Sequence, residues 1–232
     1  MQFLAETTVD GVWERSFTIG AATGLLWSPA GAPDDRPLVL LAHGGGGHKR
    51  SPAVEQRARR YASALGFASV GLDAPGHGDR RTEADVQFGI ELHERIAAGR
   101  PVGEVLAGND IAQAVPEWQA VLAALPAAGP VGFLGLSMGA AIGIPLIAAT
   151  PRISAAVLGL TGSGRADAAR ITVPIEFVMQ WDDELVPRAD SLALFDAFGS
   201  PEKTLHANPG PHHAVPPHER DSAERFLGRH LN

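Results

Sequence analysis

The stretch VGFLGLSMGAAIGIPLIAA, residues 131–149, decides the fold of this chain. It begins with VGFLGL, which is typical of a strand buried on both faces, and ends with a run of small and branched apolar residues that fits a buried helix. Between the two stands Ser137, with Gly135 and Gly139 two residues to either side. A serine at such a corner is held in a strained backbone conformation that exposes its hydroxyl, and side chains at the flanking glycines would clash. The stretch therefore predicts a strand, a tight turn with an exposed serine, and a helix whose N-terminus points at that serine.

Apolar, β-rich runs recur on both sides of this stretch and alternate with segments long enough for helices. The predicted strands are residues 24–27, 38–42, 68–72, 131–136, 155–160, 174–179 and 203–207, with 12–19 and 24–27 forming an antiparallel opening hairpin. The predicted helices are residues 51–65, 103–125, 138–149, 188–198 and 216–230. Such alternation predicts a mostly parallel sheet of about seven or eight strands, flanked by helices on both faces. We expect an α/β fold that forms a single domain over residues 1–232.

The longest interruption between predicted strands contains residues 79–102. It mixes charged residues with Phe88, Ile90, Leu92 and Ile96 at roughly helical spacing. Two interpretations fit this pattern: a small cover over a functional site, or an additional surface helix that packs on the core. A large inserted lid domain is not expected elsewhere in the chain.

The composition excludes several classes of partner and chemistry. The chain has 232 residues, with 19 Lys and Arg against 26 Asp and Glu, so its formal net charge is −7. Its basic residues are not clustered, and we expect no nucleic-acid partner. The chain has no cysteine, which rules out disulfides, thiolate metal sites and a cysteine nucleophile. Any covalent chemistry must therefore use oxygen or nitrogen.

One uncharged segment, residues 118–151, is long enough to span a bilayer. Its prolines and its glycine-rich turn divide it into a helix, a strand and a second helix, as expected of buried elements beside a parallel sheet. The first fifteen residues lack the basic start and apolar stretch of a secretory signal. We therefore expect a cytoplasmic protein with no membrane partner.

A serine hydroxyl is a weak nucleophile at neutral pH, so it needs a neighbouring base and a group that orients this base. The segment QWDDELVP, residues 180–187, follows one predicted strand, and NPGPHH, residues 208–213, follows the next. Sites in parallel sheets collect at the carboxyl ends of strands. The chain thus offers a serine, an aspartate and a histidine, in this order, at one edge of the predicted sheet.

Four motifs together make the chain similar to the α/β-hydrolase superfamily, in its branch of small serine esterases and dienelactone-hydrolase-like proteins. They are HGGGG at 43–47, DAPGHG at 73–78, GLSMG at 135–139, and the aspartate and histidine segments above. The resemblance covers essentially the whole chain from residue 38 onward, and it implies an α/β-hydrolase fold. Dienelactone hydrolases proper use a cysteine nucleophile, which this chain lacks. The resemblance therefore implies an esterase-type triad rather than the dienelactone substrate.

The resemblance assigns a role to each matching residue. Ser137 is implied as the nucleophile, His212 as the general base and acid, and Asp183 as the residue that orients His212. Asp182 and His213 remain alternatives, because a one-residue shift of either turn would exchange them with their neighbours. The oxyanion hole needs backbone N–H groups from the residue after the nucleophile, Met138, and from the glycine loop, where the resemblance indicates Gly45.

These residues predict a serine hydrolase that cleaves small-molecule carboxylic esters through an acyl-enzyme intermediate. An amidase or peptidase, a thioesterase or lactonase, and an acyltransferase or perhydrolase could use the same triad, and a binding protein on the same scaffold is a further alternative. We expect no cofactor and no metal. One group of possible metal ligands, His206, His212, His213, His218 and Glu219, has no standard ligand spacing. The sequence does not indicate the oligomeric state.

Overall fold

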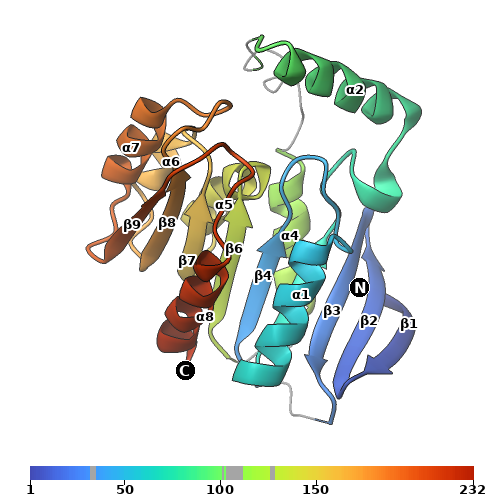
Figure 1. Ribbon diagram of the computed structural model, residues 1–232. Helices are drawn as coiled ribbons and strands as arrows, with labels where there is room; N and C mark the ends of the chain where they lie inside the picture. Colours follow the sequence, from blue (N-terminus) through green and yellow to red (C-terminus); the bar gives the residue numbers. More distant parts are fainter. Residues whose placement is uncertain (32–34, 101, 103–111, 126–128) are drawn as a thin grey trace.

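The computed structural model describes residues 1–31, 35–100, 102, 112–125 and 129–232, and it is built around one central sheet (Figure 1). Within these residues the sheet has nine strands in the order β1-β2-β3-β5-β4-β6-β7-β8-β9. The strands are β1 (Gln2–Val9), β2 (Val12–Ile19), β3 (Ala22–Pro29), β4 (Leu38–Ala42), β5 (Ala68–Leu72), β6 (Val131–Leu136), β7 (Ile153–Gly159), β8 (Ile175–Gln180) and β9 (Lys203–Asn208). From β5 to β9 every neighbouring pair is parallel, whereas β1, β2 and β3 are joined to the sheet by antiparallel pairing. The predicted α/β class with a mostly parallel sheet is confirmed.

Helices cover both faces of this sheet, with α1 and α8 in front of it and α4 and α5 behind it in the view of Figure 1. The helical segments are α1 (Pro52–Arg60), η1 (Tyr61–Leu65), η2 (Gly78–Arg80), α2 (Glu83–Ala97), α4 (Ala114–Ala124), α5 (Met138–Ala149), α6 (Arg165–Ala168), α7 (Arg188–Ala197) and α8 (His218–Leu231). None of the helices among the described residues is long and apolar enough to cross a membrane.

The central strands are buried on both faces because their side chains alternate between two apolar cores. In β4, Leu38 and Leu40 belong to the core that contains α4 and α5, whereas Val39 and Leu41 belong to the core under α1 and α8. All five residues of β4 are buried. This burial on both faces explains why the strand reads as an unbroken apolar run in the sequence.

The structure differs from the sequence-based expectation at the edge of the sheet. β1 was not predicted, and with it the sheet has nine strands instead of the expected seven or eight. All eight residues of β1 are exposed, and among the described residues its only neighbour in the sheet is β2. A strand without a buried face carries no alternation of apolar and polar residues, so the sequence pattern does not reveal it.

The predicted helix over 103–125 is found only in part. The structure has α4 from Ala114 to Ala124, and residues 103–111 lie outside the described part of the chain. The predicted helix over 51–65 exists, but its last five residues form the π-helical turn η1, which ends at Gly66 in the left-handed conformation. The π-helical turn lies at the end of its helix and does not change the layer arrangement.

Candidate active site

Ser137 stands at the corner between β6 and α5, as the sequence predicts. Its φ of 57° and ψ of −123° lie outside the regions that residues with a side chain normally adopt. The corner closes tightly, because a Cβ added to Gly135 would lie 2.6 Å from the backbone of Gly139, and one added to Gly139 would lie 2.5 Å from the carbonyl oxygen of Ala42. The Ser137 N–H donates to the carbonyl of Gly159 on β7 at 2.9 Å. The serine hydroxyl is thus held outside the helix, at the carboxyl edge of the sheet.

The structure brings Ser137, His212 and Asp183 together from three separate loops. His212 Nε2 lies 3.0 Å from Ser137 Oγ, and His212 Nδ1 lies 2.7 Å from Asp183 Oδ2. Because an ionised carboxylate can only accept, Nδ1 is the donor to Asp183 and Nε2 is left to accept the serine O–H. The side chains of His212 and Asp183 are each only 3% exposed.

Asp183 is held by more than the histidine. The backbone N–H groups of Leu185 and Val186 both donate to Asp183 Oδ1 at 2.8 Å. Burial opposes ionisation of this carboxyl, but the hydrogen bonds from His212 and from the two backbone N–H groups outweigh it and hold its pKa below the usual value. Asp183 is therefore a fixed negative charge against Nδ1 of His212.

The two alternatives left open by the sequence occupy different places. Asp182 accepts a hydrogen bond from the backbone N–H of Gly210 at 3.0 Å, and its side chain is 62% exposed. His213 is exposed and meets the ring of His212 edge to face, with 5.0 Å between ring centroids. Neither of them joins the hydrogen-bonded row that runs through Asp183 and His212 to Ser137.

One residue of this arrangement was missed by the sequence analysis. Glu184 Oε2 accepts the backbone N–H of His212 at 2.9 Å, so the acidic loop after β8 holds both the ring and the backbone of the histidine. The only local signal is an acidic side chain beside Asp183. Such a signal cannot distinguish a hydrogen-bonding carboxylate from a solvated one.

The glycine loop after β4 lies beside the serine. A Cβ added to Gly44 would lie 3.9 Å from the Cβ of Ser137, and Gly45 lines the same pocket as Ser137 and Met138. Met138 is the first residue of α5, so its N–H has no carbonyl partner within the helix. Gly45 and Met138, which the sequence indicates as oxyanion donors, therefore line the same pocket as Ser137.

A pocket of about 1510 Å³ opens over the serine. One wall is α2, whose residues Phe88, Leu92 and Ile96 line the pocket. This helix lies across the top of the molecule in Figure 1. None of the residues of α2 is buried, and Ile90 is 47% exposed on its outer side. The four apolar residues that the sequence grouped in this segment are thus divided between the pocket and the solvent.

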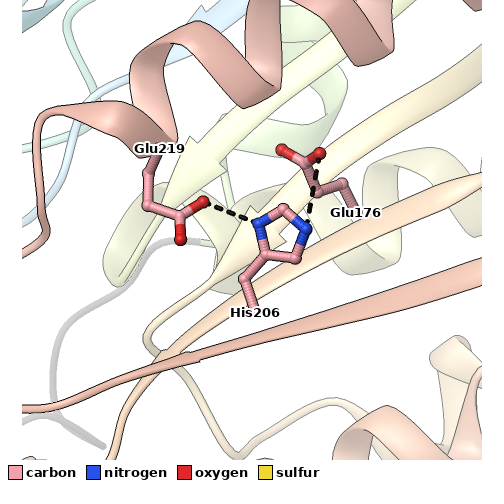
Figure 2. Close-up of side chains that lie close together, drawn as sticks. All are labelled: Glu176, His206 and Glu219. Atoms are coloured by element: carbon pink, nitrogen blue, oxygen red, sulfur yellow. Dashed lines mark hydrogen bonds and ion pairs between the residues drawn. The ribbon is translucent and has the colours of Figure 1, made fainter.

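The structure does not bring the five possible metal ligands of the sequence analysis together in one site. His212 belongs to the row at Ser137, whereas His206 and Glu219 form a separate cluster with Glu176 (Figure 2). In this cluster His206 Nδ1 is already hydrogen-bonded to Glu219 Oε2 at 2.7 Å, and Ser222 donates to Glu176. Glu219 also accepts from Asn208 at 2.9 Å. These contacts tie the start of α8 to β9 and so close the base of the loop that carries His212.

Comparisons with known proteins give structural matches only. No protein-family model matches the sequence, and no curated protein matches it. A cold-adapted esterase from an Arctic intertidal metagenomic library, solved with bound polyethylene glycol, is 34% identical over 100% of both chains, with a TM-score of 0.83. A dienelactone hydrolase from Anabaena variabilis is 20% identical over 100% of both chains, with a TM-score of 0.62. An acetyl xylan esterase from a Paenibacillus species is 14% identical over 99% of this chain and 88% of its own, with a TM-score of 0.72. The last two identities support a shared fold alone.

Proposed function

Because the chain belongs to the α/β-hydrolase superfamily and its relatives of known structure include esterases, we propose that it is a serine hydrolase that cleaves small-molecule carboxylic esters. In this proposal Ser137 is the nucleophile, His212 the general base and acid, and Asp183 the residue that orients His212. Gly45 and Met138 supply the N–H groups of the oxyanion hole.

The observation that carries this proposal is the row of short contacts from Asp183 through His212 to Ser137, at the border of a large pocket. A serine in a strained corner has no evident structural task, whereas a serine aligned with a buried, oriented histidine can be deprotonated as it attacks. The helix α5 begins directly after this serine, and its partial positive charge favours a developing oxyanion.

The proposed reaction has two halves. His212 Nε2 takes the proton of Ser137 while Oγ attacks the acyl carbon, and the carbonyl oxygen becomes an oxyanion facing the N–H groups of Gly45 and Met138. The tetrahedral intermediate collapses, and the alcohol leaves with the proton from His212. A water molecule, deprotonated by the same histidine, then attacks the acyl-enzyme and releases the acid and free Ser137.

The proposal is tested by hydrolysis of p-nitrophenyl esters from acetate to long-chain acyl groups, with Ser137→Ala as the paired variant. We expect the native protein to hydrolyse at least one member of the series, and the variant to lose about 10³-fold or more of kcat while retaining its fold. Thr161→Ala, which changes another hydroxyl that lines the same pocket, serves as the control. A folded native protein that hydrolyses none of these esters and is not labelled at Ser137 by a fluorophosphonate would contradict the proposal.

A further inference from the structure

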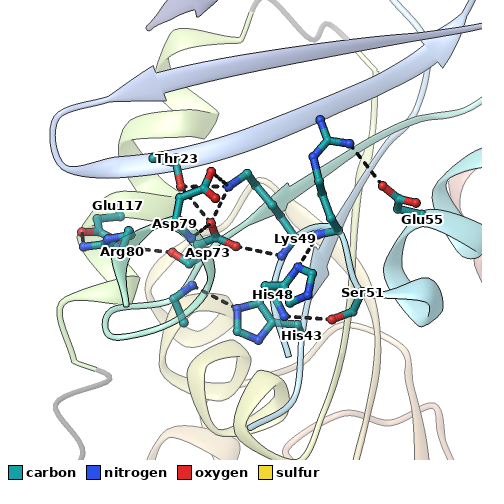
Figure 3. Close-up of polar contacts among 12 residues, drawn as sticks. Thr23, His43, His48, Lys49, Ser51, Glu55, Asp73, Asp79, Arg80 and Glu117 are labelled. Atoms are coloured by element: carbon teal, nitrogen blue, oxygen red, sulfur yellow. Dashed lines mark hydrogen bonds and ion pairs between the residues drawn. The ribbon is translucent and has the colours of Figure 1, made fainter. Parts of the chain in front are cut away.

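The glycine loop at residues 44–47 is attached at both ends to the same two residues after β5 (Figure 3). At its start, His43 Nδ1 donates to the carbonyl of Gly44 at 2.8 Å, and His43 Nε2 accepts the backbone N–H of Ala74 at 3.1 Å. Past its end, the backbone N–H of Lys49 donates to Asp73 Oδ1 at 2.8 Å. Asp73 and Ala74 are adjacent, so this one short segment fixes both ends of the loop.

The middle of the loop has little else to hold it. A Cβ added to Gly45 or Gly46 would meet no atom within 4 Å, and both residues are exposed. The N–H of Gly47 closes a turn onto the carbonyl of Gly44 at 3.0 Å. Four consecutive glycines have more backbone freedom than any other sequence, and their ends therefore decide where their N–H groups lie.

Asp73 is the centre of the attachment. Its carboxylate is fully buried and accepts hydrogen bonds from the Lys49 ammonium, from the backbone N–H of Asp79 at 3.0 Å and from Thr23 Oγ1 at 2.9 Å, in addition to the Lys49 N–H. The Lys49 ammonium also contacts Asp79 at 2.6 Å and Thr23 Oγ1 at 3.1 Å, and the Lys49 side chain is only 6% exposed. Lys49 is thus bound through both its backbone and its side chain to one carboxylate.

We propose that Lys49 and Asp73 are positioning residues that hold the glycine loop at the distance from Ser137 at which its N–H group meets the oxyanion. This inference rests on the proposed function, because it assigns a purpose to the loop only if an oxyanion forms there. A buried ion pair adds little net stability, but it fixes geometry when all its hydrogen bonds are made. A displacement of a catalytic group by about 1 Å can lower a rate by roughly 100-fold.

The test is Lys49→Met, which removes the ammonium and leaves three hydrogen-bond donors on Asp73: the N–H groups of residues 49 and 79 and the Thr23 hydroxyl. We expect kcat for a short p-nitrophenyl ester to fall about 10- to 100-fold, with KM changed less than about threefold. The inhibition constant of an alkyl trifluoromethyl ketone is expected to rise by a similar factor. Ser137 adds to this ketone, the carbonyl electrons move to oxygen and His212 takes the proton, so its affinity reports the oxyanion site.

The control is Arg59→Met, which removes another partly buried ion pair, the one between Arg59 and Glu14, neither of which lines the pocket. It is expected to leave kcat and the ketone affinity unchanged.

If Lys49→Met does not fold, Thr23→Val is the second variant, because it removes one donor to Asp73 and one acceptor of Lys49. We expect it to lower kcat and the ketone affinity two- to fivefold. A folded Lys49→Met or Thr23→Val variant with native kcat and native ketone affinity overturns the inference. An inactive native enzyme would instead contradict the proposed function, so the two failures are distinguishable.

Discussion

At the scale of single residues, Asp183 and Asp182 are neighbours in sequence with different surroundings. Asp183 is buried against His212 Nδ1, whereas Asp182 is exposed and accepts a backbone N–H. We expect Asp183→Asn to lower kcat by roughly 10³- to 10⁴-fold. An amide in this place no longer carries the charge that orients the imidazole and stabilises its protonated form.

The matched control for this change is Asp182→Asn. It removes the same charge one residue earlier, and kcat is expected to stay within about threefold of the native value. Steady-state kinetics of the two variants on one ester decide between the two aspartates. A larger loss in Asp182→Asn than in Asp183→Asn would mean that the acidic turn is shifted by one residue in the working enzyme.

From the sequence, a functional residue can be predicted only where the residues around it form a recognisable local pattern. Ser137 could be found because a strand, two glycines and a helix surround it in the sequence. Lys49 and Asp73 are 24 residues apart, and their contact depends on how β4 and β5 pair. Glu184 contacts His212 across 28 residues. Partners separated in this way have no common pattern, so the sequence points to the three residues of the proposed triad but not to the residues that hold them in place.

At the scale of elements, α2 forms one wall of the pocket. It starts with a capping box, in which Thr82 and Asp85 exchange hydrogen bonds between side chain and backbone. Phe88, Leu92 and Ile96 follow at intervals of four residues and line the pocket. This periodicity places one apolar stripe of the helix over the space above Ser137.

We expect Leu92→Trp to shorten the acyl chain that the enzyme accepts. The larger ring would fill part of the pocket under α2, so kcat/KM for a p-nitrophenyl octanoate should fall by about tenfold or more, while the value for the acetate changes less than about threefold. Ile90→Trp adds the same ring on the exposed side of the same helix and is expected to leave the ratio unchanged. Equal effects of the two variants would show that α2 does not limit the substrate.

The elements that the sequence predicts best are those buried on both faces. Three predicted strands, at 38–42, 68–72 and 131–136, have the same bounds as β4, β5 and β6. The unbroken apolar runs of β4 and β6 follow from contact with both cores, and β5 is buried from Ser69 to Leu72. β1 is exposed along its whole length, and its pairing with β2 alone determines that it is a strand.

At the scale of the whole molecule, the parallel sheet gathers all parts of the candidate site. The glycine loop follows β4, Asp73 follows β5, Ser137 follows β6, and the loops with Asp183 and His212 follow β8 and β9. Because these strands are parallel, their carboxyl ends share one edge. The order of the motifs in the sequence thus predicts that they meet. The distances between them depend on loop geometry, which the order of motifs does not contain.

This architecture also has a consequence for the stability of the whole molecule toward acid. His43 is buried at the end of β4, and burial lowers its pKa from 6.5 to about 4. The unfolded chain therefore binds more protons than the folded one between these two values, and the stability contributed by neutral His43 is lost as the pH falls from 6.5 toward 4.

With a shift of this size, protonation of His43 is expected to remove about 3 kcal/mol of unfolding free energy between pH 7 and pH 4. Urea unfolding of His43→Asn at both pH values should show a pH dependence smaller by about this amount than that of the native chain. Equal pH dependence in the native chain and His43→Asn would mean that burial does not lower the pKa of His43 in the folded protein.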